Sequence, residues 1–254
     1  MRKILLFLIS LVCISLSIFA QDNPVFQQHP EDIIFHLSYD AGSLSADMAE
    51  GDGKPFRQYR APEFTTGVFG GKALKSGSHV YWTKKNFYPN QSGTLIAWVS
   101  PLNWPSKQPD LKTKEPAFTV FSSGLILGKM FRQNWSKSCM HFTVQYSKNS
   151  CGVHISSEGN VTQWKNGQWH LLVATWDLGN IALSIDGSPS KSIQIPKKAI
   201  DHNVMTIGTN ADQPYHVAID EITILKRKLS TQEITALYQQ AKPLIRQNTS
   251  AAKK

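Results

Sequence analysis

The sequence predicts an all-β fold, either a sandwich or a barrel, followed by one short helix. Three observations favour this fold class: short apolar stretches recur from residue 31 onward, Gly, Pro, Asn and Asp separate them, and helical periodicity is nearly absent. The chain has 254 residues, and residues 30–241 are sufficient for one such domain.

Residues 1–20 have the three parts of an export signal. Arg2 and Lys3 precede an apolar run over residues 4–19, and Ala20 supplies the small residue before the expected cleavage point. The run is shorter than the roughly 20 residues that cross a bilayer as a helix, and no later run is longer. We therefore expect no membrane span after cleavage, and a protein that is secreted, periplasmic or on the cell surface.

Two alternatives to a cleaved signal stay open. The apolar run can act as an uncleaved anchor. A lipoprotein at Cys13 is less favoured, because Val12 stands where such signals need a small residue. The residues that follow, 21–29, are expected to form a loose leader before the domain.

The strands are predicted where apolar or alternating stretches are bounded by turn residues. They are residues 33–39, 73–82, 94–100, 117–122, 141–147, 153–157, 170–176, 181–186, 204–208 and 217–225. The clearest alternation places Ile181, Leu183 and Ile185 on one face of a half-buried strand. Asp186 and Gly187 follow, a pair that favours a tight hairpin turn.

One helix is predicted near the C-terminal end. Ser230 and Glu233 have the spacing of a capping box, in which each side chain bonds to the backbone N–H of the other residue. Pro243 is expected to end the helix at about Ala241. Residues 242–254 are then expected to be a disordered basic tail.

The charge indicates the class of partner. The formal net charge of +9 favours acidic partners, including sulfated or carboxylated polysaccharides, through long-range attraction. The basic residues are not interleaved with aromatic residues in a nucleic-acid motif, so we expect no nucleic-acid partner.

Cys139 and Cys151 remain after signal removal, and they can pair in an oxidising compartment. A hairpin turn at residues 147–150 would not place them opposite each other, however. A disulfide and two free thiols both stay open.

Catalytic signatures are missing from the sequence. It contains no GxSxG, HExxH, P-loop or GxGxxG motif, and its 8 histidines have no ligand spacing. Glycoside hydrolysis needs two carboxylates roughly 5 to 10 Å apart. Asp220 and Glu221 are adjacent in a strand, so we expect them to face opposite ways. We predict a protein that is not an enzyme, although a lyase with His and Tyr bases stays open.

Six short segments carry a family resemblance. They are residues 70–74 (GGKAL), 93–101 (GTLIAWVSP), 167–177 (GQWHLLVATWD), 181–187 (IALSIDG), 205–209 (MTIGT) and 219–234 (IDEITILKRKLSTQEI). In this order they resemble the laminin G-like jelly roll of the concanavalin A-like lectin/glucanase superfamily. The resemblance implies two curved antiparallel sheets, with ligand sites on the concave face or at the loop rim. Laminarinase-type hydrolases of this fold use Glu-x-Asp-x-x-Glu, and Ala218 and Thr223 occupy both glutamate positions here.

The same resemblance implies a Ca²⁺ site built from an acid near the first strand and the Asp of the IDE motif. Asp220 matches the second position. Ser38 stands where the first acid is usual, and Asp40 is displaced by two residues. Because Ca²⁺ needs six to eight oxygens with carboxylates among them, the site is expected from Asp40 and Asp220 or is lost. The alternative is that Asp220 and Glu221 cap loops or form ion pairs.

Sugar binding needs flat aromatic surfaces that stack on pyranose rings. Trp82, Trp104, Trp135 and Trp164 lie in or beside turn-rich segments and are the candidates, with a buried packing role as the alternative. The tryptophans at 98, 169 and 176 belong to strand motifs and are expected in the core. The predicted function is an exported, non-catalytic domain that binds poly- or oligosaccharides, including anionic ones. The alternative is a protein-interaction or structural module of the cell envelope, and a polysaccharide-degrading enzyme is less favoured.

Overall fold

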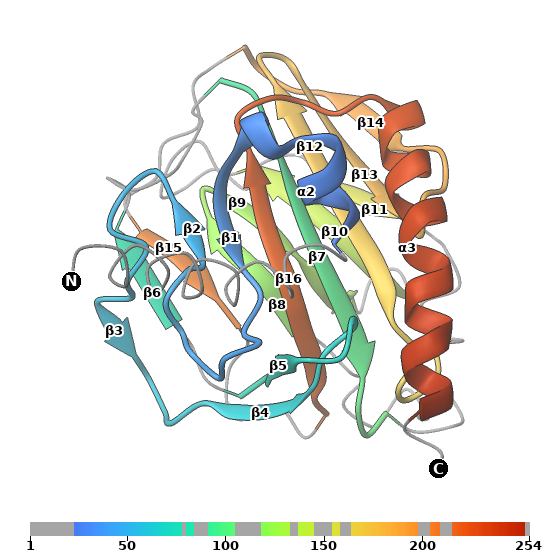
Figure 1. The fold of residues 1–254 in the computed structure, drawn as a ribbon. Helices are drawn as coiled ribbons and strands as arrows, with labels where there is room; N and C mark the ends of the chain where they lie inside the picture. Colours follow the sequence, from blue (N-terminus) through green and yellow to red (C-terminus); the bar gives the residue numbers. More distant parts are fainter. Residues whose placement is uncertain are drawn as a thin grey trace, which may run out of the picture.

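A computed structural model gives the fold and describes most of the predicted domain. The described residues are 23–77, 80–83, 91–104, 118–132, 137–144, 154–157, 164–197, 204–208 and 215–251. Within them the strands form two antiparallel sheets that lie face to face, with one long helix against the first sheet (Figure 1). The predicted all-β class is confirmed, and the fold is a sandwich rather than a barrel.

The first sheet has nine strands. In spatial order they are β14 (Lys191–Gln194), β13 (Asn180–Ile185), β12 (His170–Asp177), β7 (Gly93–Pro101), β16 (Val217–Leu225), β1 (Ile33–Leu37) and β2 (Met48–Ala49), with β5 (Lys72–Lys75) paired to β16 and β4 (Glu63–Thr66) paired to β5.

The second sheet has seven strands. Their order is β11 (His154–Ser157), β10 (Lys137–Val144), β9 (Leu125–Arg132), β8 (Phe118–Ser123), β15 (Val204–Ile207), β6 (Val80–Thr83) and β3 (Arg57–Gln58). β3 is therefore an edge strand of this sheet.

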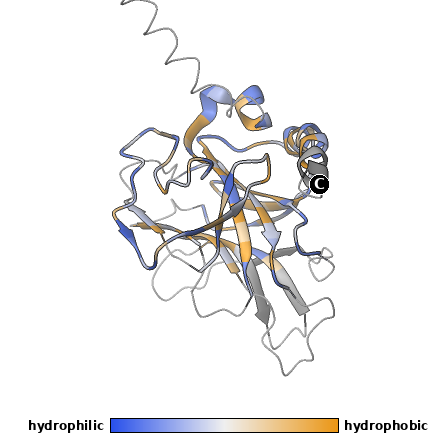
Figure 2. Ribbon diagram, turned by 60° about the horizontal axis from the view of Figure 1, so that its bottom comes forward, coloured by the Kyte–Doolittle hydropathy of each residue, from blue (hydrophilic) through white to orange (hydrophobic). Residues whose placement is uncertain are grey.

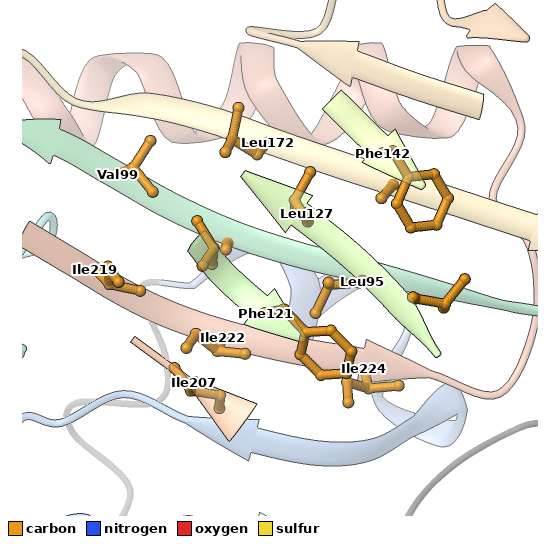
Figure 3. Close-up of a cluster of buried hydrophobic side chains, with 14 of the residues drawn as sticks. Leu95, Val99, Phe121, Leu127, Phe142, Leu172, Ile207, Ile219, Ile222 and Ile224 are labelled. Carbon is orange, nitrogen blue, oxygen red and sulfur yellow. The ribbon is translucent and has the colours of Figure 1, made fainter. Parts of the chain in front are cut away.

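The main core lies between the two sheets. Leu95 and Val99 on β7 point toward Phe121 on β8 and Leu127 on β9 (Figure 3), and none of the four is more than 1% exposed. Burying a side chain of this size contributes roughly 1.5–3 kcal/mol relative to leaving it exposed. In Figure 2 the apolar stretches run along the strands in the middle of the molecule, whereas the peripheral segments are mostly polar.

A second apolar cluster lies on the other face of the nine-stranded sheet. Trp98 and Val173 project from the sheet and pack under α3 (Thr231–Ala251), whose Ile234 and Leu237 face them. The predicted capping box is present: the Ser230 N–H donates to Glu233 Oε2 at 2.7 Å, and the Glu233 N–H donates to Ser230 Oγ at 3.2 Å.

The predicted end of this helix is wrong. α3 continues through Pro243 to Ala251, so residues 242–251 of the expected tail are helical, and residues 252–254 lie outside the described residues. Its apolar stripe extends past the proline, because Ile245 packs on the same cluster as Ala241 one turn earlier. Tertiary packing thus outweighs the hydrogen bond that proline removes. Among the described residues, no helix is long and apolar enough to cross a membrane.

The leader expected over residues 21–29 is, from Asn23 on, an ordered part of the fold. α2 (Pro24–Gln28) buries Val25 in the second cluster, and a single 3-10 turn (Pro30–Asp32) leads into β1. Arg227 then ties this segment to α3, donating to Asp32 at 2.5 Å and to Glu233 at 2.8 Å.

Two strand predictions need correction. Residues 73–82 form β5 and β6 in different sheets rather than one strand: Gly77, at φ 129°, turns the chain after the Ser76 N–H has bonded to the Val217 carbonyl at 2.8 Å. β13 is buried on both faces, since Ser184 is 1% exposed beneath the hairpin that α3 covers. The turn itself is as predicted, because Asp186 and Gly187 both have positive φ.

Candidate functional site

A β-bulge in β16 places two acids on one side of the nine-stranded sheet. The pairing of β16 with β7 shifts register between Asp220 and Thr223, and Glu221, at φ 51°, is the inserted residue. Asp220 is paired with Trp98, on the helix-covered face, and Glu221 reaches His36 on the same face. The expectation that the two acids face opposite ways is therefore wrong.

Glu221 is buried among polar side chains of the N-terminal segment. The Asn23 amide donates to its carboxyl, and His36 Nε2 lies 3.4 Å from it. Burial, followed by the charge of Asp40, raises the pKa of Glu221 to about 8. Burial also lowers the pKa of His36 to about 4. At neutral pH both groups are then mainly uncharged, so this 3.4 Å approach is a polar contact rather than an ion pair.

Asp220 and Asp40 approach one turn of the chain from two sides. The turn is closed by a bond from the Gly67 N–H to the Gly71 carbonyl at 3.0 Å. A Cβ at position 67 would lie 2.7 Å from Asp220 Oδ2, and one at position 71 would lie 1.7 Å from Asp40 Oδ1. Glycine is required at both positions because the carboxylates occupy the space of a side chain.

These acids repel one another in a buried setting. Burial and the charge of Glu221 raise the pKa of Asp220, and burial and the charge of Asp47 raise the pKa of Asp40. Asp220 Oδ2 accepts from the Val68 N–H at 2.8 Å, whereas its Oδ1 is buried without a hydrogen-bond partner in the described structure. We call Asp40, Asp47, Asp220 and Glu221 the acidic cluster.

The sequence-predicted metal pair is thus brought together, with Ser38 beside it. Ser38 Oγ accepts from the Asp40 N–H at 3.2 Å, so it supports the displaced acid rather than replacing it. Among the described residues no three His, Cys, Asp or Glu side chains are grouped so as to hold a metal ion. An ion between Asp40 and Asp220 would therefore need backbone or water oxygens as its further ligands.

Of the predicted sugar-binding tryptophans, the three that the structure describes do not form an exposed surface. Trp82 is 0% exposed in the core and donates to the Gly53 carbonyl at 3.1 Å, so its proposed stacking role is wrong. Trp104, 7% exposed, and the half-buried Trp164 stack on each other and on the core, with Trp164 3.9 Å from the His170 ring. Both are mainly packing residues in this arrangement.

Other predicted site residues lie outside the described residues. These are Trp135 and Cys151, together with the Cys139 side chain, although the Cys139 backbone belongs to β10. The disulfide remains a prediction.

The outer face of the seven-stranded sheet presents a row of partly exposed side chains. Strand register places Arg57 of β3 beside Tyr81, Tyr81 beside Thr206, Thr206 beside Ser122, and Ser122 beside Ile126. Their neighbours along the strands, such as Val80 and Phe121, point into the core. The row therefore crosses five strands, and its three middle members, on β6, β15 and β8, offer hydroxyl and aromatic groups to solvent.

The row ends in exposed aromatic residues at the β3 edge. Phe56 is 55% exposed and its ring lies 6.3 Å from that of Tyr81, while Tyr59 is 58% exposed. The Arg57 guanidinium lies 5.8 Å from the Tyr81 ring, and that of Arg60 lies 5.8 Å from the Tyr59 ring. We call Phe56, Tyr59 and Tyr81 the aromatic surface.

Sequence reasoning missed this surface because it followed tryptophan alone. The available signal was the stretch KPFRQYR, residues 54–60, in which aromatic and basic residues alternate with no aliphatic residue to bury. Ala218 and Thr223, at the positions of the hydrolase glutamates, are buried in β16 and carry no carboxylate.

Comparison with known proteins agrees with this architecture. The model of the concanavalin A-like lectin/glucanases superfamily named Laminin_G_3 matches residues 74–235. Similar solved structures include the binding domain of botulinum neurotoxin DC in complex with SialylT and the same domain in complex with rat synaptotagmin II, each with TM-score 0.61, 16% identity, and coverage of 83% of this chain and 52% of that one. The botulinum neurotoxin serotype D binding domain has TM-score 0.59, 14% identity, and coverage of 82% and 52%.

This chain thus spans about half the length of those binding domains, and at such identities the likeness concerns the fold. No curated protein sequence matches the chain. This chain belongs to the laminin G-like group of the concanavalin A-like lectin/glucanase superfamily, because the family model matches residues 74–235 and the structure has the two facing sheets of that fold.

Proposed function

We propose that this protein is an exported, non-catalytic domain that recognises poly- or oligosaccharides. The observation that carries the proposal is the aromatic surface, where Phe56 and Tyr59 are more than half exposed on a lectin-type sandwich. Exposed aromatic side chains that are grouped on one surface mark a binding site more often than isolated ones do. The faces of pyranose rings stack on such side chains while polar neighbours bind the hydroxyls.

The row of side chains beside the aromatic surface supports a chain-like ligand. Tyr81, Thr206 and Ser122 follow one another across neighbouring strands, which lie about 4.8 Å apart. An extended saccharide laid across the strands would meet a ring at the edge and hydroxyl groups further in. One related fold, the toxin binding domain, is described in complex with SialylT, which supports a glycan as the ligand class.

A protein ligand is the second candidate. The same toxin binding domain is also described in complex with rat synaptotagmin II, so this fold accommodates protein partners as well. Export, through the predicted signal at residues 1–20, would place either ligand outside the cytoplasm.

Calcium is proposed as a structural ion rather than a catalytic one. Asp40 and Asp220 would supply carboxylate oxygens, and the buried, unpartnered Asp220 Oδ1 supports a cation beside it. A bound ion would counteract the burial and, after it, the repulsion between carboxylates that raise the pKa values of Asp220 and Asp40. Ca²⁺ at about 100 times its Kd should then stabilise the fold by about 2.7 kcal/mol.

Calcium binding is tested by thermal unfolding with added Ca²⁺ or Mg²⁺. Wild-type protein should melt at higher temperature with Ca²⁺, and Asp220→Asn should not respond. Glu63→Gln is the matched control, since Glu63 is an exposed acid paired with Lys75 and should leave the response intact. An equal response of wild type and Asp220→Asn would reject this site.

The carbohydrate proposal is tested with a glycan array followed by calorimetry on the mature chain. Phe56→Ala combined with Tyr59→Ala should weaken binding about tenfold or more. Leu178→Ala is the control, because Leu178 is an equally accessible apolar residue, 43% exposed, on the turn between β12 and β13 of the other sheet. Binding to none of the saccharides above background would overturn the proposal.

A further inference from the structure

We infer that the aromatic surface takes an anionic polysaccharide, whose carboxylate or sulfate groups bind to Arg57 and its basic neighbours. The inference rests on the proposed saccharide function and names its ligand class. It concerns the stretch 54–60, where Lys54, Arg57 and Arg60 alternate with Phe56 and Tyr59 and no acid intervenes.

All five of these side chains are exposed. Arg57 is placed by β3, where it is the register partner of Tyr81, so strand pairing fixes its backbone beside the ring. Its guanidinium lies over that ring at 5.8 Å, and the side chain is exposed. A guanidinium stacked on a ring face can still donate hydrogen bonds from its planar edge.

No carboxylate pairs with Arg57 among the residues that the structure describes, in contrast to Arg227 on the helical side. Arg227 is already held by Asp32 and Glu233. Glu63, three residues beyond Arg60, is likewise occupied by Lys75 at 2.6 Å. Within the described ranges Arg57 is thus a cation on β3 with no carboxylate partner, and it adjoins rings that suit a pyranose face.

A guanidinium binds carboxylate and sulfate through two parallel hydrogen bonds, which a neutral sugar does not offer. The formal net charge is +9 for the whole sequence and +7 once the predicted signal has removed Arg2 and Lys3 (9 − 2), and this charge adds long-range attraction for a polyanion. Nucleic acid is also a polyanion and would be attracted in the same way. The hydroxyl groups of Thr206 and Ser122 beside the rings favour a hydroxyl-rich saccharide over stacked bases.

The test compares polymers that share a backbone and differ in charge: dextran sulfate with dextran, and polygalacturonate with its methyl ester. Affinity is measured by calorimetry at about 50 mM and about 300 mM NaCl, where screening lengths differ more than twofold. At least one acidic polymer should bind about tenfold or more tightly than its neutral partner, and salt should weaken it.

Two variants with equal loss of charge locate the effect. Arg57→Gln with Arg60→Gln should reduce affinity for the acidic polymer about tenfold or more. Lys191→Gln with Lys197→Gln removes the same charge from exposed positions at the β14 edge and should change it little. Arg57→Lys should restore only part of the loss, because it keeps the charge without the paired donors.

The outcomes separate the two proposals. If the arginine variant binds the acidic polymer as well as wild type while Phe56→Ala with Tyr59→Ala does not, the anionic ligand class is overturned and saccharide binding stands. If neither acidic nor neutral polymers bind, saccharide binding itself is overturned. Duplex DNA bound as tightly as the acidic polymer, with the same dependence on Arg57, would replace the polysaccharide with nucleic acid.

Discussion

The two sheets of this sandwich share one core but differ in their outer faces. The nine-stranded sheet carries an apolar cluster on its outer face, where Trp98 and Val173 are covered by α3. The seven-stranded sheet presents Tyr81, Thr206 and Ser122, which are partly exposed. One outer face thus carries α2, α3 and the acidic cluster, and the other leaves side chains exposed where we propose that the ligand binds.

The largest effect is expected on the covered face. Trp98 is 3% exposed, stacks on Tyr238 of α3 with ring centroids 6.4 Å apart, and meets Phe69 edge-on. Trp98→Ala should lower the free energy of unfolding by about 3–5 kcal/mol. Urea unfolding measures this, with Trp98→Phe as a milder control. A loss below about 1 kcal/mol would show that α3 is not held by this contact.

The acidic cluster should make stability fall at alkaline pH. The pKa of Glu221 is raised to about 8 in the folded state, so the folded protein binds more protons than the unfolded chain between about pH 4.5 and 8. The lowered pKa of His36, about 4, has the opposite effect between about pH 4 and 6.5. The two effects largely cancel up to about pH 6.5, and above it the free energy of unfolding should fall by about 2 kcal/mol by pH 8.

Glu221→Gln removes one of these two titrations. The variant should lose the fall above about pH 6.5 and show instead the rise due to His36 at lower pH. Raised pKa values at Asp40 and Asp220 act in the same direction as Glu221 and will leave a residual slope. Denaturant unfolding at several pH values, with a chelator present, measures the free energy of unfolding of wild type and of Glu221→Gln. Identical pH profiles would contradict a buried, protonated Glu221.

A smaller effect is expected at the start of α3. Ser230→Ala removes the hydroxyl that accepts from the Glu233 N–H at 3.2 Å and should cost about 1 kcal/mol. Ser190→Ala, in the turn before β14, is a surface control that should cost less. If thermal unfolding shows a larger loss for Ser190→Ala than for Ser230→Ala, the Ser230 cap does not stabilise α3 as predicted.

The smallest effect on stability is expected on the open face. Tyr81→Ala should change the free energy of unfolding by only about 0.5 kcal/mol, because its ring lies outside the core. Saccharide affinity should fall in the same variant. A stability loss as large as that of Trp98→Ala would mean that Tyr81 is a core residue and that both outer faces contribute equally to stability.

The sequence predicted well where a signal was local. The strands at 94–100, 170–176 and 217–225 correspond to β7, β12 and β16, and the capping box at Ser230 and Glu233 forms as expected. Each depends on neighbours within one element: strand alternation, or a hydroxyl three residues from an acid. Such patterns need no knowledge of the rest of the chain.

The candidate sites could not be predicted from single strands, because they depend on how each strand pairs with its neighbours. Trp82 was expected at a surface, but the register of β6 turns it inward and Tyr81 outward, and a one-residue slip would exchange them. Asp220 and Glu221 share a side because of a bulge whose only local sign is a positive φ at Glu221. Both outcomes depend on pairing with distant strands.

The network around Arg227 has a consequence for how the domain is displayed. It joins His29 and Asp32, near the first described residues, to Glu233 at the base of α3. The first described segment, through Val25, and α3 thus lie on the same outer face of the nine-stranded sheet. A tether or fusion partner attached at Asn23, the first described residue, would therefore sit on the face of the nine-stranded sheet that α3 covers, across the core from the outer face of the seven-stranded sheet.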